Sequence, residues 1–327
     1  MTPPSLSRSY SLYDLRVQVT TNSPEMLTAV HARLRQFLVP EQAAPDLQFQ
    51  LRAVARVQDH VFDQPPHGAR PVYDPPLGQV VYSAVEDRLY IVYGENVRVW
   101  CDPAQGRTKV SIVASALESL WLVSHPLFTI PFVEMMKRRG RYSVHAAALA
   151  LDGRGVLLPA GSGSGKSTLA LALLRAGFGF LGDDTLFLAD EKGGLRVFAF
   201  PDEIDATDAT LAFFPELQYL LDRPKAAGAP KRQLWVEEVY GIDFVRQCEP
   251  SLLVFPRIAH TTQSSIEPMS KDEALLEMVP NILLTEAQST QAHLDALGKL
   301  AQRSRCFRLE TGRDFDDLSE RLRRLLD

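Results

Sequence analysis

Nine consecutive residues, Ala160–Thr168, have the composition of a loop that holds phosphate groups. They read Ala-Gly-Ser-Gly-Ser-Gly-Lys-Ser-Thr and match the pattern of Ala or Gly, four residues, Gly-Lys, then Ser or Thr. Gly161, Gly163 and Gly165 let the backbone turn so that successive N–H groups point into one cavity. An apolar strand candidate precedes the loop and a helix candidate follows it, as the motif requires. The segment therefore predicts a P-loop that binds ATP together with Mg²⁺.

The remaining residues of the loop have separate tasks in phosphate chemistry. Lys166 is expected to reach the β- and γ-phosphates, and the Ser167 hydroxyl is expected to ligate Mg²⁺. The alternatives are a chance Gly/Ser-rich loop and a relative that has lost nucleotide binding. The flanking pattern and the presence of both side chains disfavour them. The predicted cofactor-binding residues are Gly161, Ser162, Gly163, Ser164, Gly165, Lys166, Ser167 and Thr168.

Two adjacent carboxylates, Asp183 and Asp184, follow the loop seventeen residues after Lys166, at the end of the apolar segment 178–181. If the sheet is parallel, the carboxyl ends of its strands line the ligand crevice. One carboxylate could then hold Mg²⁺ while the other accepts the proton of an attacking hydroxyl. We favour Asp183 as the base and Asp184 as the metal ligand. The alternative is a solvated Asp-Asp turn.

A histidine stands on the strand candidate before the loop, in the run Val144-His145-Ala146-Ala147-Ala148. A lone histidine among small apolar residues is usually a satisfied core residue. The functional reading places His145 beside the two aspartates, where it would orient a carboxylate or tune its pKa. The predicted catalytic residues are Asp183, His145 and Lys166, and the predicted metal ligands are Ser167 and Asp184.

Four further residues are weaker candidates. Lys231 and Arg232 precede a strand candidate and could bind the γ-phosphate or an acidic substrate, although a solvated basic pair is the ordinary alternative. Arg257 follows the strand candidate Leu252–Pro256 and could face the same crevice. Glu203 is a candidate second metal ligand, with a surface turn as the alternative.

Composition excludes several classes of protein. The 327 residues are 46% hydrophobic and 23% charged, which is typical of a globular chain, and the net charge of −5 does not favour nucleic acid. The most apolar stretch, Ala114–Met136, contains Glu118 and two prolines, so we expect a broken helix rather than a membrane span. The first residues, Met1–Ser5, lack a basic start followed by an apolar run, so we expect no secretory signal. Three widely spaced cysteines predict neither a zinc site nor a disulfide framework, and we expect a cytoplasmic protein. They are Cys101, Cys248 and Cys306.

The pattern changes near residue 140. We expect an accessory mixed α/β domain at 1–139 and a catalytic α/β domain at 140–327. In the first, a helix should begin at Pro24 with Ser23 as its cap and an apolar face of Met26, Val30, Leu34 and Leu38. A helical stretch at Ser115–Lys137 should break near His125-Pro126. Its predicted strands are Ser11–Thr20, Asp46–Val57, Val80–Val85, Leu89–Tyr93, Val97–Cys101 and Arg107–Val113.

The second part alternates strand and helix candidates. Ser270 and Glu273 predict a capping box. The predicted strands are Ser143–Leu151, Gly155–Pro159, Phe178–Leu181, Leu186–Ala189, Leu195–Phe200 and Leu252–Phe255, and the predicted helices are Lys166–Ala176, Phe213–Leu221, Glu273–Leu284, Thr290–Gln302 and Phe315–Leu326.

Three segments together resemble a known family. His145-Ala-Ala-Ala, Gly155–Leu169 and Leu181–Thr185 resemble the C-terminal catalytic domain of HPr kinase/phosphorylase. They are more similar still to the HPr-kinase-related serine kinases of peptide-modification clusters, including lasso-peptide kinases. The specific match covers about 141–190, and a weaker one extends through Leu252–Pro256 and Ser270–Leu276.

The resemblance implies a P-loop kinase core like that of phosphoenolpyruvate carboxykinase and a serine kinase activity. By the family's pattern, Asp183 would be the base with His145 as its neighbour, and Ser167 and Asp184 would serve Mg²⁺. The chain departs from the family after the two aspartates. Where HPr kinases have a Leu-Glu-Val-Arg-Gly-like signature, it has Leu234-Trp-Val-Glu-Glu-Val-Tyr-Gly241, without the arginine. The resemblance therefore does not extend to the reverse, phosphorylase activity or to HPr as substrate.

We therefore expect an ATP- and Mg²⁺-dependent kinase that phosphorylates a serine of a peptide or small protein, with no nucleic acid or membrane partner. The N-terminal part would dock the acceptor or a sister subunit, so a homo-oligomer stays open. Free serine or another small molecule is the nearest alternative acceptor. A nucleotide-gated regulator without phosphoryl transfer is an alternative of another class. A transport-type ATPase is disfavoured because no Leu-Ser-Gly-Gly-Gln-like signature is present.

Overall fold

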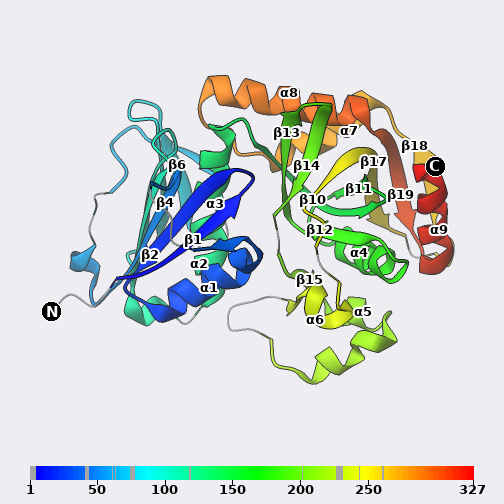
Figure 1. Cartoon of the computed structure of the whole chain (residues 1–327), viewed down its shortest axis with the longest axis horizontal. Coiled ribbons are helices and arrows are strands. Elements are labelled where there is room, and N and C mark those ends of the chain that lie inside the picture. The colour runs from blue at the N-terminus through cyan, green and yellow to red at the C-terminus, as the bar shows by residue number, and fades with distance from the viewer. Residues whose placement is uncertain are drawn as a thin grey trace. The chain divides into compact units, whose positions relative to one another are not determined.

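The computed structural model describes residues 5–40, 44–60, 62, 64–73, 78–117, 119–200, 202–225, 231–242, 244–259 and 261–327. The chain forms two compact units (Figure 1). The first contains the residues up to Arg139 and the later segment Leu283–Thr290. The second contains Gly140–Lys225, the residues from 231 to Ile282, and Gln291–Asp327.

The first unit is built on a mixed sheet. Strands β6 to β9 form the antiparallel meander that the sequence predicts, whereas β4 is parallel to both β2 and β9. In the described part of the chain, the strand order is β3-β1-β2-β4-β9-β8-β7-β6-β5. The strands are β1 (Leu6–Leu12), β2 (Leu15–Thr21), β3 (Leu38–Val39), β4 (Leu47–Val54), β5 (Arg70–Tyr73), β6 (Gln79–Ser83), β7 (Arg88–Tyr93), β8 (Val97–Asp102) and β9 (Arg107–Val113).

Helices α1 (Pro24–Leu34), α2 (Leu120–Ser124) and α3 (Pro126–Lys137) belong to the same unit, with 3₁₀ turns at Arg35–Phe37, Val57–Asp59 and Ala114–Ala116. The predicted cap is confirmed, because Ser23 accepts a 3.3 Å hydrogen bond from the Met26 amide. The predicted break before Pro126 is also confirmed, since α2 ends at Ser124 and α3 begins at Pro126. The Phe128 ring of α3 packs on Phe49 of β4 with ring centroids 4.4 Å apart.

Two predictions for this unit are wrong. The segment predicted as one strand, Ser11–Thr20, is the β1–β2 hairpin. Its turn residues Tyr13 and Asp14 have φ of 50° and 70°, the left-handed geometry that matches strand twist in tight hairpins. Leu38, predicted on the apolar face of α1, lies in β3 and is 51% exposed.

A buried ion pair within α3 is hydrogen-bonded to the later segment Leu283–Thr290. Lys137 Nζ lies 2.9 Å from Glu134 Oε2, and the two side chains are 1% and 0% exposed. The Thr285 hydroxyl donates to Glu134 Oε1 at 2.6 Å, and Lys137 Nζ donates to Thr285 Oγ1 at 2.7 Å. Two buried charges are stable only when they are paired and hydrogen-bonded, so the first unit needs this late segment.

The second unit contains both strands and helices. Its strands are β10 (Tyr142–Leu151), β11 (Arg154–Pro159), β12 (Gly179–Gly182), β13 (Thr185–Glu191), β14 (Gly194–Ala199), β15 (Ile204–Ala206), β16 (Arg232–Leu234), β17 (Gln247–Ile258), β18 (Ser265–Pro268) and β19 (Arg305–Thr311). Its helices are α4 (Lys166–Arg175), α5 (Asp208–Leu211), α6 (Val236–Tyr240), α7 (Lys271–Met278), α8 (Ala287–Arg303) and α9 (Phe315–Leu326), with 3₁₀ turns at Pro215–Asp222 and Val279–Asn281. Helix α8 begins in the first unit and belongs to the second from Gln291 onward.

The direction of its strands places several loops at one edge. Strands β11 and β12 are both antiparallel to β10, so they run in the same direction. Strand β17 is parallel to β11 and to β19. The carboxyl ends of β11, β12 and β17 therefore lie at the same edge, although the sheet is mixed rather than parallel as expected.

Apolar side chains cover both faces of this sheet. Helices α4 and α9 pack on one face through Leu169, Leu173, Leu318 and Leu322. Helix α8 packs on β13 and β14 through Leu297 and Leu300, as Figure 1 also shows.

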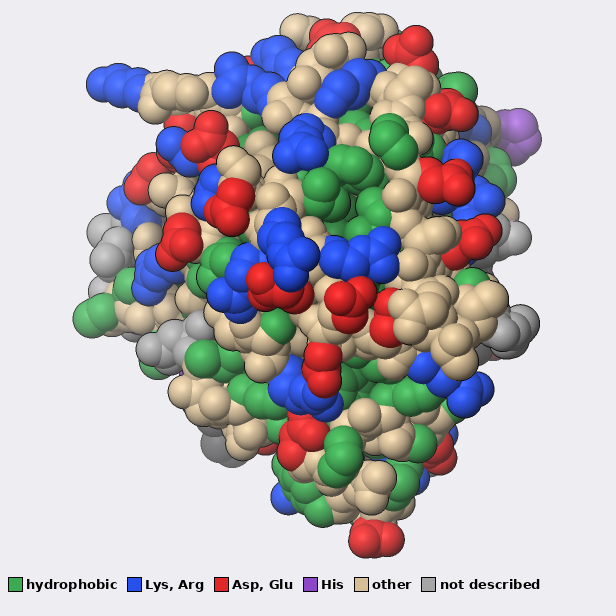
Figure 2. All heavy atoms as spheres, turned by 90° about the vertical axis from the view of Figure 1, so that its right-hand side faces the viewer, with side chains coloured by type: hydrophobic (Ala, Val, Ile, Leu, Met, Phe, Trp, Pro, Cys, Tyr) green, Lys and Arg blue, Asp and Glu red, His purple; other side chains and the backbone are tan. Residues whose placement is uncertain are grey.

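The molecular surface on the side where α9 lies carries basic and acidic side chains next to one another (Figure 2). No helix among the described residues is long and apolar enough to cross a membrane.

Two helical predictions need adjustment. The capping box of Ser270 and Glu273 is confirmed, but α7 ends at Met278 and not at Leu284, because Pro280 follows two residues later and cannot continue the helix. The segment predicted as a helix at Phe213–Leu221 is a 3₁₀ helix at Pro215–Asp222.

Candidate active site

The glycine-rich loop connects the carboxyl end of β11 to α4. Gly163 and Gly165 have φ of +83° and +94°, and Gly165 is the N-cap of α4. A side chain at Gly165 would be strained by this φ, and its Cβ would also approach Ile258 Cγ1 to 3.2 Å. The loop therefore requires glycine at this position, and α4 begins directly with Lys166.

The carboxyl end of β12 brings Asp183 to the start of α4. The Ser167 hydroxyl donates a 2.8 Å hydrogen bond to Asp183 Oδ2, and Asp183 is 4% exposed. Burial raises the pKa of Asp183 to about 6, whereas the Lys166 charge and the Ser167 hydrogen bond act to lower it, and the charges of Asp184 and Asp205 raise it further. The surroundings of the Asp183 carboxyl group therefore disfavour its charged form.

This pair of side chains fits a divalent cation. Asp183 Oδ1 is buried, and no hydrogen bond reaches it from the residues that the structure describes. A buried carboxylate oxygen without a partner is costly. A hydroxyl and a carboxylate supply the hard oxygen ligands that Mg²⁺ takes. Ser167 and Asp183 would hold such an ion.

Asp184 lies in a different environment. Its Oδ1 is 3.0 Å from His145 Nδ1 and 3.9 Å from Lys166 Nζ, and its side chain is 53% exposed. Lys166 Nζ lies 3.3 Å from His145 Nε2. Because an ammonium group can only donate, Nε2 must accept, and the ring proton is then on Nδ1 and points to Asp184.

Strand pairing fixes these positions. His145 pairs with Thr185 across β10 and β13, and the Ala146 amide donates to the Asp184 carbonyl at 3.1 Å. The structure thus brings together five of the residues proposed from the sequence, which are His145, Lys166, Ser167, Asp183 and Asp184.

Thr168, the last residue of the loop motif, makes a separate contact. Its hydroxyl is 3.0 Å from the Thr210 hydroxyl of α5, and the Thr210 amide donates to Thr207 Oγ1 at 3.1 Å. Thr168 therefore connects the start of α4 to the segment that follows β15.

The three basic candidates have other partners or positions. Arg232 forms an ion pair with Asp208 at 2.8 Å. Arg257 forms one with Glu277 of α7 at 3.0 Å. Because strand side chains alternate, Arg257 faces the side opposite to Ile258, which borders the glycine-rich loop. Lys231 is partly exposed just before β16. Substrate contact by these residues stays a prediction.

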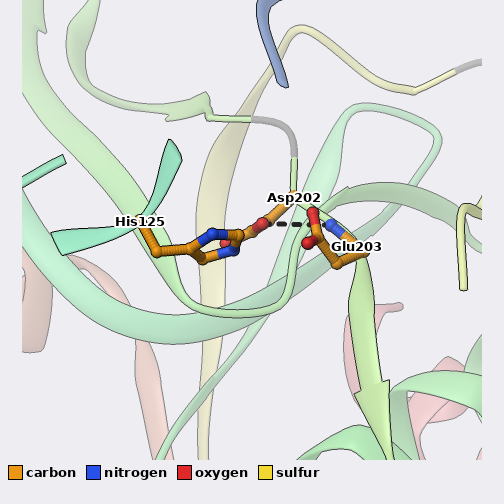
Figure 3. A group of neighbouring side chains, drawn as sticks. All are labelled: His125, Asp202 and Glu203. Atoms are coloured by element: carbon orange, nitrogen blue, oxygen red, sulfur yellow. Dashed lines mark hydrogen bonds between the residues drawn. The ribbon is translucent and has the colours of Figure 1, made fainter. Parts of the chain in front are cut away.

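The acidic segment before β15 is held by one local hydrogen bond and one to β16. The Glu203 amide donates to Asp202 Oδ1 at 3.1 Å (Figure 3). The Glu203 carboxylate accepts from Gln233 Nε2 at 2.7 Å. The sequence reasoning did not select Asp205, whose charge acts on Asp183. The apolar-polar-apolar order of Ile204, Asp205 and Ala206 was the available signal.

Comparisons with known proteins find similarity among solved structures. No protein-family model matches the sequence. No curated protein matches it. Among solved structures, the chain is similar to the Hpr(Ser) kinase/phosphatase from Coxiella burnetii at 18% identity, over 56% of this chain and 93% of that chain, with a TM-score of 0.31. The activity of the present chain must therefore follow from its own residues.

Proposed function

We propose that the protein is an ATP- and Mg²⁺-dependent kinase that phosphorylates a serine hydroxyl of a peptide or small protein. The observation that carries the proposal is the cluster at the carboxyl ends of β11 and β12. There Ser167 contacts Asp183, while Lys166 and His145 contact Asp184. This arrangement combines a phosphate loop, a cation site and a candidate base, which are the parts that phosphoryl transfer requires.

The chain's own residues bind and orient the nucleotide. The amides of the loop and the N-terminus of α4 would bind phosphate oxygens, and Lys166 would move from His145 to the β- and γ-phosphates. Ser167 and Asp183 would hold the cation. When bound, Mg²⁺ would neutralise charge on the phosphate oxygens.

Contrary to the assignment favoured from the sequence, we assign the base to Asp184. Its exposure lets an acceptor hydroxyl reach it, whereas Asp183 is buried against Ser167. The acceptor oxygen would form a bond to the γ-phosphorus, the bond to the β–γ bridging oxygen would break, and the hydroxyl proton would pass to the Asp184 carboxylate. His145 would position this carboxylate through Nδ1. One consideration favours the other assignment, because burial raises the pKa of Asp183 and makes it a stronger base than an ordinary aspartate before the cation binds.

The acceptor class rests on the resemblance to peptide-directed serine kinases, and the N-terminal unit would dock the acceptor or a second copy of the chain. Free serine is the second candidate acceptor, because the exposed position of Asp184 would also admit a small molecule.

The proposal is tested by measuring ADP release and phosphoserine formation with Mg²⁺-ATP. The acceptors are a serine-containing peptide library and free L-serine. ADP that appears only with an acceptor supports a kinase, and the acceptor that is labelled identifies the class. ADP release without an acceptor would indicate an ATPase. ATP binding without any ADP release would indicate a regulator, and either result would overturn the proposal.

A further inference from the structure

The sheet of the first unit has an apolar face that is covered by helices. Phe49 of β4 packs on Phe128 of α3, and helix α1 contacts β1 and β2. Because side chains alternate along a strand, Gln50 and Arg52 of β4 point to the opposite face. Both side chains are exposed, and so is Lys109, which is paired with Gln50 across β4 and β9. The opposite face is therefore open to solvent at these strands.

Basic side chains and one indole share this open face. Lys109 of β9 is paired with Trp100 of β8 and lies two residues after Arg107. Arg88 lies two residues before Tyr90, which is paired with Trp100 across β7 and β8. Pairing and alternation thus place these side chains on one side of the sheet. We call this surface the basic sheet face, and it comprises Arg52, Arg88, Trp100, Arg107 and Lys109.

The indole of Trp100 holds two of the cations in place. Arg88 Cζ and Lys109 Nζ each lie 5.2 Å from the centroid of the Trp100 ring, within the range of cation–π attraction. Arg88 is also 3.8 Å from Asp102 and 3.9 Å from Glu86. Side chains that are positioned before a ligand arrives lose less conformational entropy when it binds.

Three cations of this face are exposed and lack a carboxylate partner. Among the residues that the structure describes, no acid forms an ion pair with Arg52, Arg107 or Lys109. The segment after β4 contacts the face through His60, whose Nδ1 is 2.7 Å from Ser111 Oγ, and this contact brings no acid to the cations. The chain as a whole has a net charge of −5. Positive charge gathered on one face of such a chain attracts an anionic partner.

The spacing of the cations fits an extended acidic peptide. Arg107 and Lys109 are two residues apart on β9, so their Cα atoms are about 6.6 Å apart. Alternate residues of an extended peptide have the same spacing and point to one side, so two acidic residues in such positions can pair with both cations. A nucleic acid strand fits less well. It binds through aromatic rings that are open for base stacking, whereas the Trp100 ring already contacts two cations.

We propose that the basic sheet face docks an acidic segment of the acceptor peptide. This inference deepens the proposed function and rests on it for identifying the bound peptide as the acceptor. The cations would recognise the carboxylates of Asp or Glu residues, and the serine that is phosphorylated would lie elsewhere in the same peptide.

The first experiment measures binding of a fluorescein-labelled oligoglutamate peptide to the full chain by fluorescence anisotropy, at low salt and without ATP. The double variant Arg107→Gln with Lys109→Gln should weaken binding about 2- to 30-fold, the combined effect of losing two exposed ion pairs. Lys192→Gln with Lys225→Gln is the matched control, because it removes the same charge from exposed positions of the second unit. It should bind as tightly as the unmodified protein.

A kinetic comparison separates docking from chemistry. The acceptors are serine peptides with and without flanking glutamates. Arg107→Gln with Lys109→Gln should raise KM for the acidic peptide about 2- to 30-fold, and should leave kcat and the KM of the neutral peptide unchanged. Its melting temperature should match that of the unmodified protein, because both side chains are exposed.

Several results would overturn the inference. These are no binding of oligoglutamate by the unmodified protein, and equal binding by the two double variants. Tighter binding of oligothymidylate through the same residues would assign the face to nucleic acid. A dimer that only Arg107→Gln with Lys109→Gln dissociates would assign it to a second copy of the chain.

The outcomes also separate this inference from the proposed function. If oligoglutamate binds at the basic sheet face but no peptide is phosphorylated, the acidic-peptide site stands and the kinase proposal fails. If serine peptides are phosphorylated without preference for acidic residues and oligoglutamate does not bind, the kinase proposal stands and the docking inference fails.

Discussion

The Ser167 hydroxyl donates a 2.8 Å hydrogen bond to Asp183 Oδ2, although the two residues are sixteen positions apart in the sequence. In P-loop proteins that bind nucleotides, the corresponding hydroxyl and an aspartate share the Mg²⁺ site. The contact therefore occupies the place where a cation would bind both groups. It also removes Asp183 Oδ2 from the path of an acceptor and leaves the exposed Asp184 as the more accessible carboxylate.

Asp184→Asn should lower kcat by roughly 10²- to 10⁴-fold with little change in ATP or Mn²⁺ binding, because it removes the proposed base. Asp183→Asn should instead weaken Mn²⁺ binding. Turnover is measured by ADP release and cation binding by paramagnetic resonance. Asp190→Asn is the control, since its carboxylate pairs with Lys299 on the surface. Normal turnover in Asp184→Asn, with loss of turnover and intact Mn²⁺ binding in Asp183→Asn, would restore the assignment made from the sequence.

Lys166→Ala should weaken the binding of Mg²⁺-ATP by about 1.5–3 kcal/mol, the usual worth of a hydrogen bond to a charged group. The reason is that it removes the ammonium group expected at the β- and γ-phosphates. Titration calorimetry measures the change. Lys192→Ala removes an equal charge from an exposed turn and should bind ATP normally. Unchanged affinity in Lys166→Ala would contradict the phosphate-loop assignment.

Cation binding should depend on pH through Asp183, whose pKa burial raises to about 6. Below that pH a proton competes with the cation, so Mn²⁺ affinity should fall about tenfold per pH unit. Above it the affinity should level off. Binding measured without nucleotide from pH 5 to 8 checks this, and Asp183→Asn should remove the dependence. A profile that is flat in the unmodified protein would contradict it.

The protonation of Asp183 should also change the folding stability of the protein with pH. The folded carboxyl has a pKa of about 6 and the unperturbed value is 3.8, so the folded state binds the proton more tightly. In the cation-free protein this contribution is present below pH 3.8 and is lost as the pH rises to about 6. Melting temperatures of the unmodified protein and Asp183→Asn should therefore diverge over that interval. If the melting temperatures of the two proteins instead changed with pH in parallel, the pKa of Asp183 would not be raised by folding.

Lys137→Met should destabilise the first unit by less than the loss of about 3–5 kcal/mol that a fully uncompensated buried charge causes, because Glu134 keeps its 2.9 Å ion pair with Arg138. The double change Glu134→Leu with Lys137→Met should cost less than the single change, since the buried carboxylate is then also removed and Arg138 keeps Asp87 at 2.7 Å. Trp100 and Trp121 report on this unit once Trp235 is replaced by Phe, so urea unfolding followed by fluorescence measures both variants. Equal losses in the single and double variants would contradict the buried-pair account.

Local sequence patterns were sufficient to predict those elements whose structure depends only on residues close to one another in the chain. The cap at Ser23, the break before Pro126 and the capping box at Ser270 each depend on neighbours within a few residues. The same holds for the meander β6–β9, whose apolar alternation and turns lie in one continuous stretch. These features could be predicted because the physical cause is contained in the pattern.

Other features depend on contacts that the sequence does not show. The turn at Tyr13 and Asp14 adopts positive φ without glycine or asparagine, so Asp14 alone gave a weak turn signal. The two aspartates are adjacent, and only their distant partners Ser167 and His145 distinguish them. Asp205 depends on where β15 packs, which is a long-range relation.

The contact between Thr285 and Lys137 has a consequence for synthesis on the ribosome. The two residues are 148 positions apart, and at about 5–20 residues per second translation needs roughly 7–30 s to cover that distance. During this interval α3 has emerged, but its buried ion pair has no hydroxyl partner. The nascent N-terminal unit would remain incomplete while most of the following unit is translated, so the first part of the chain to appear is not the first to finish folding.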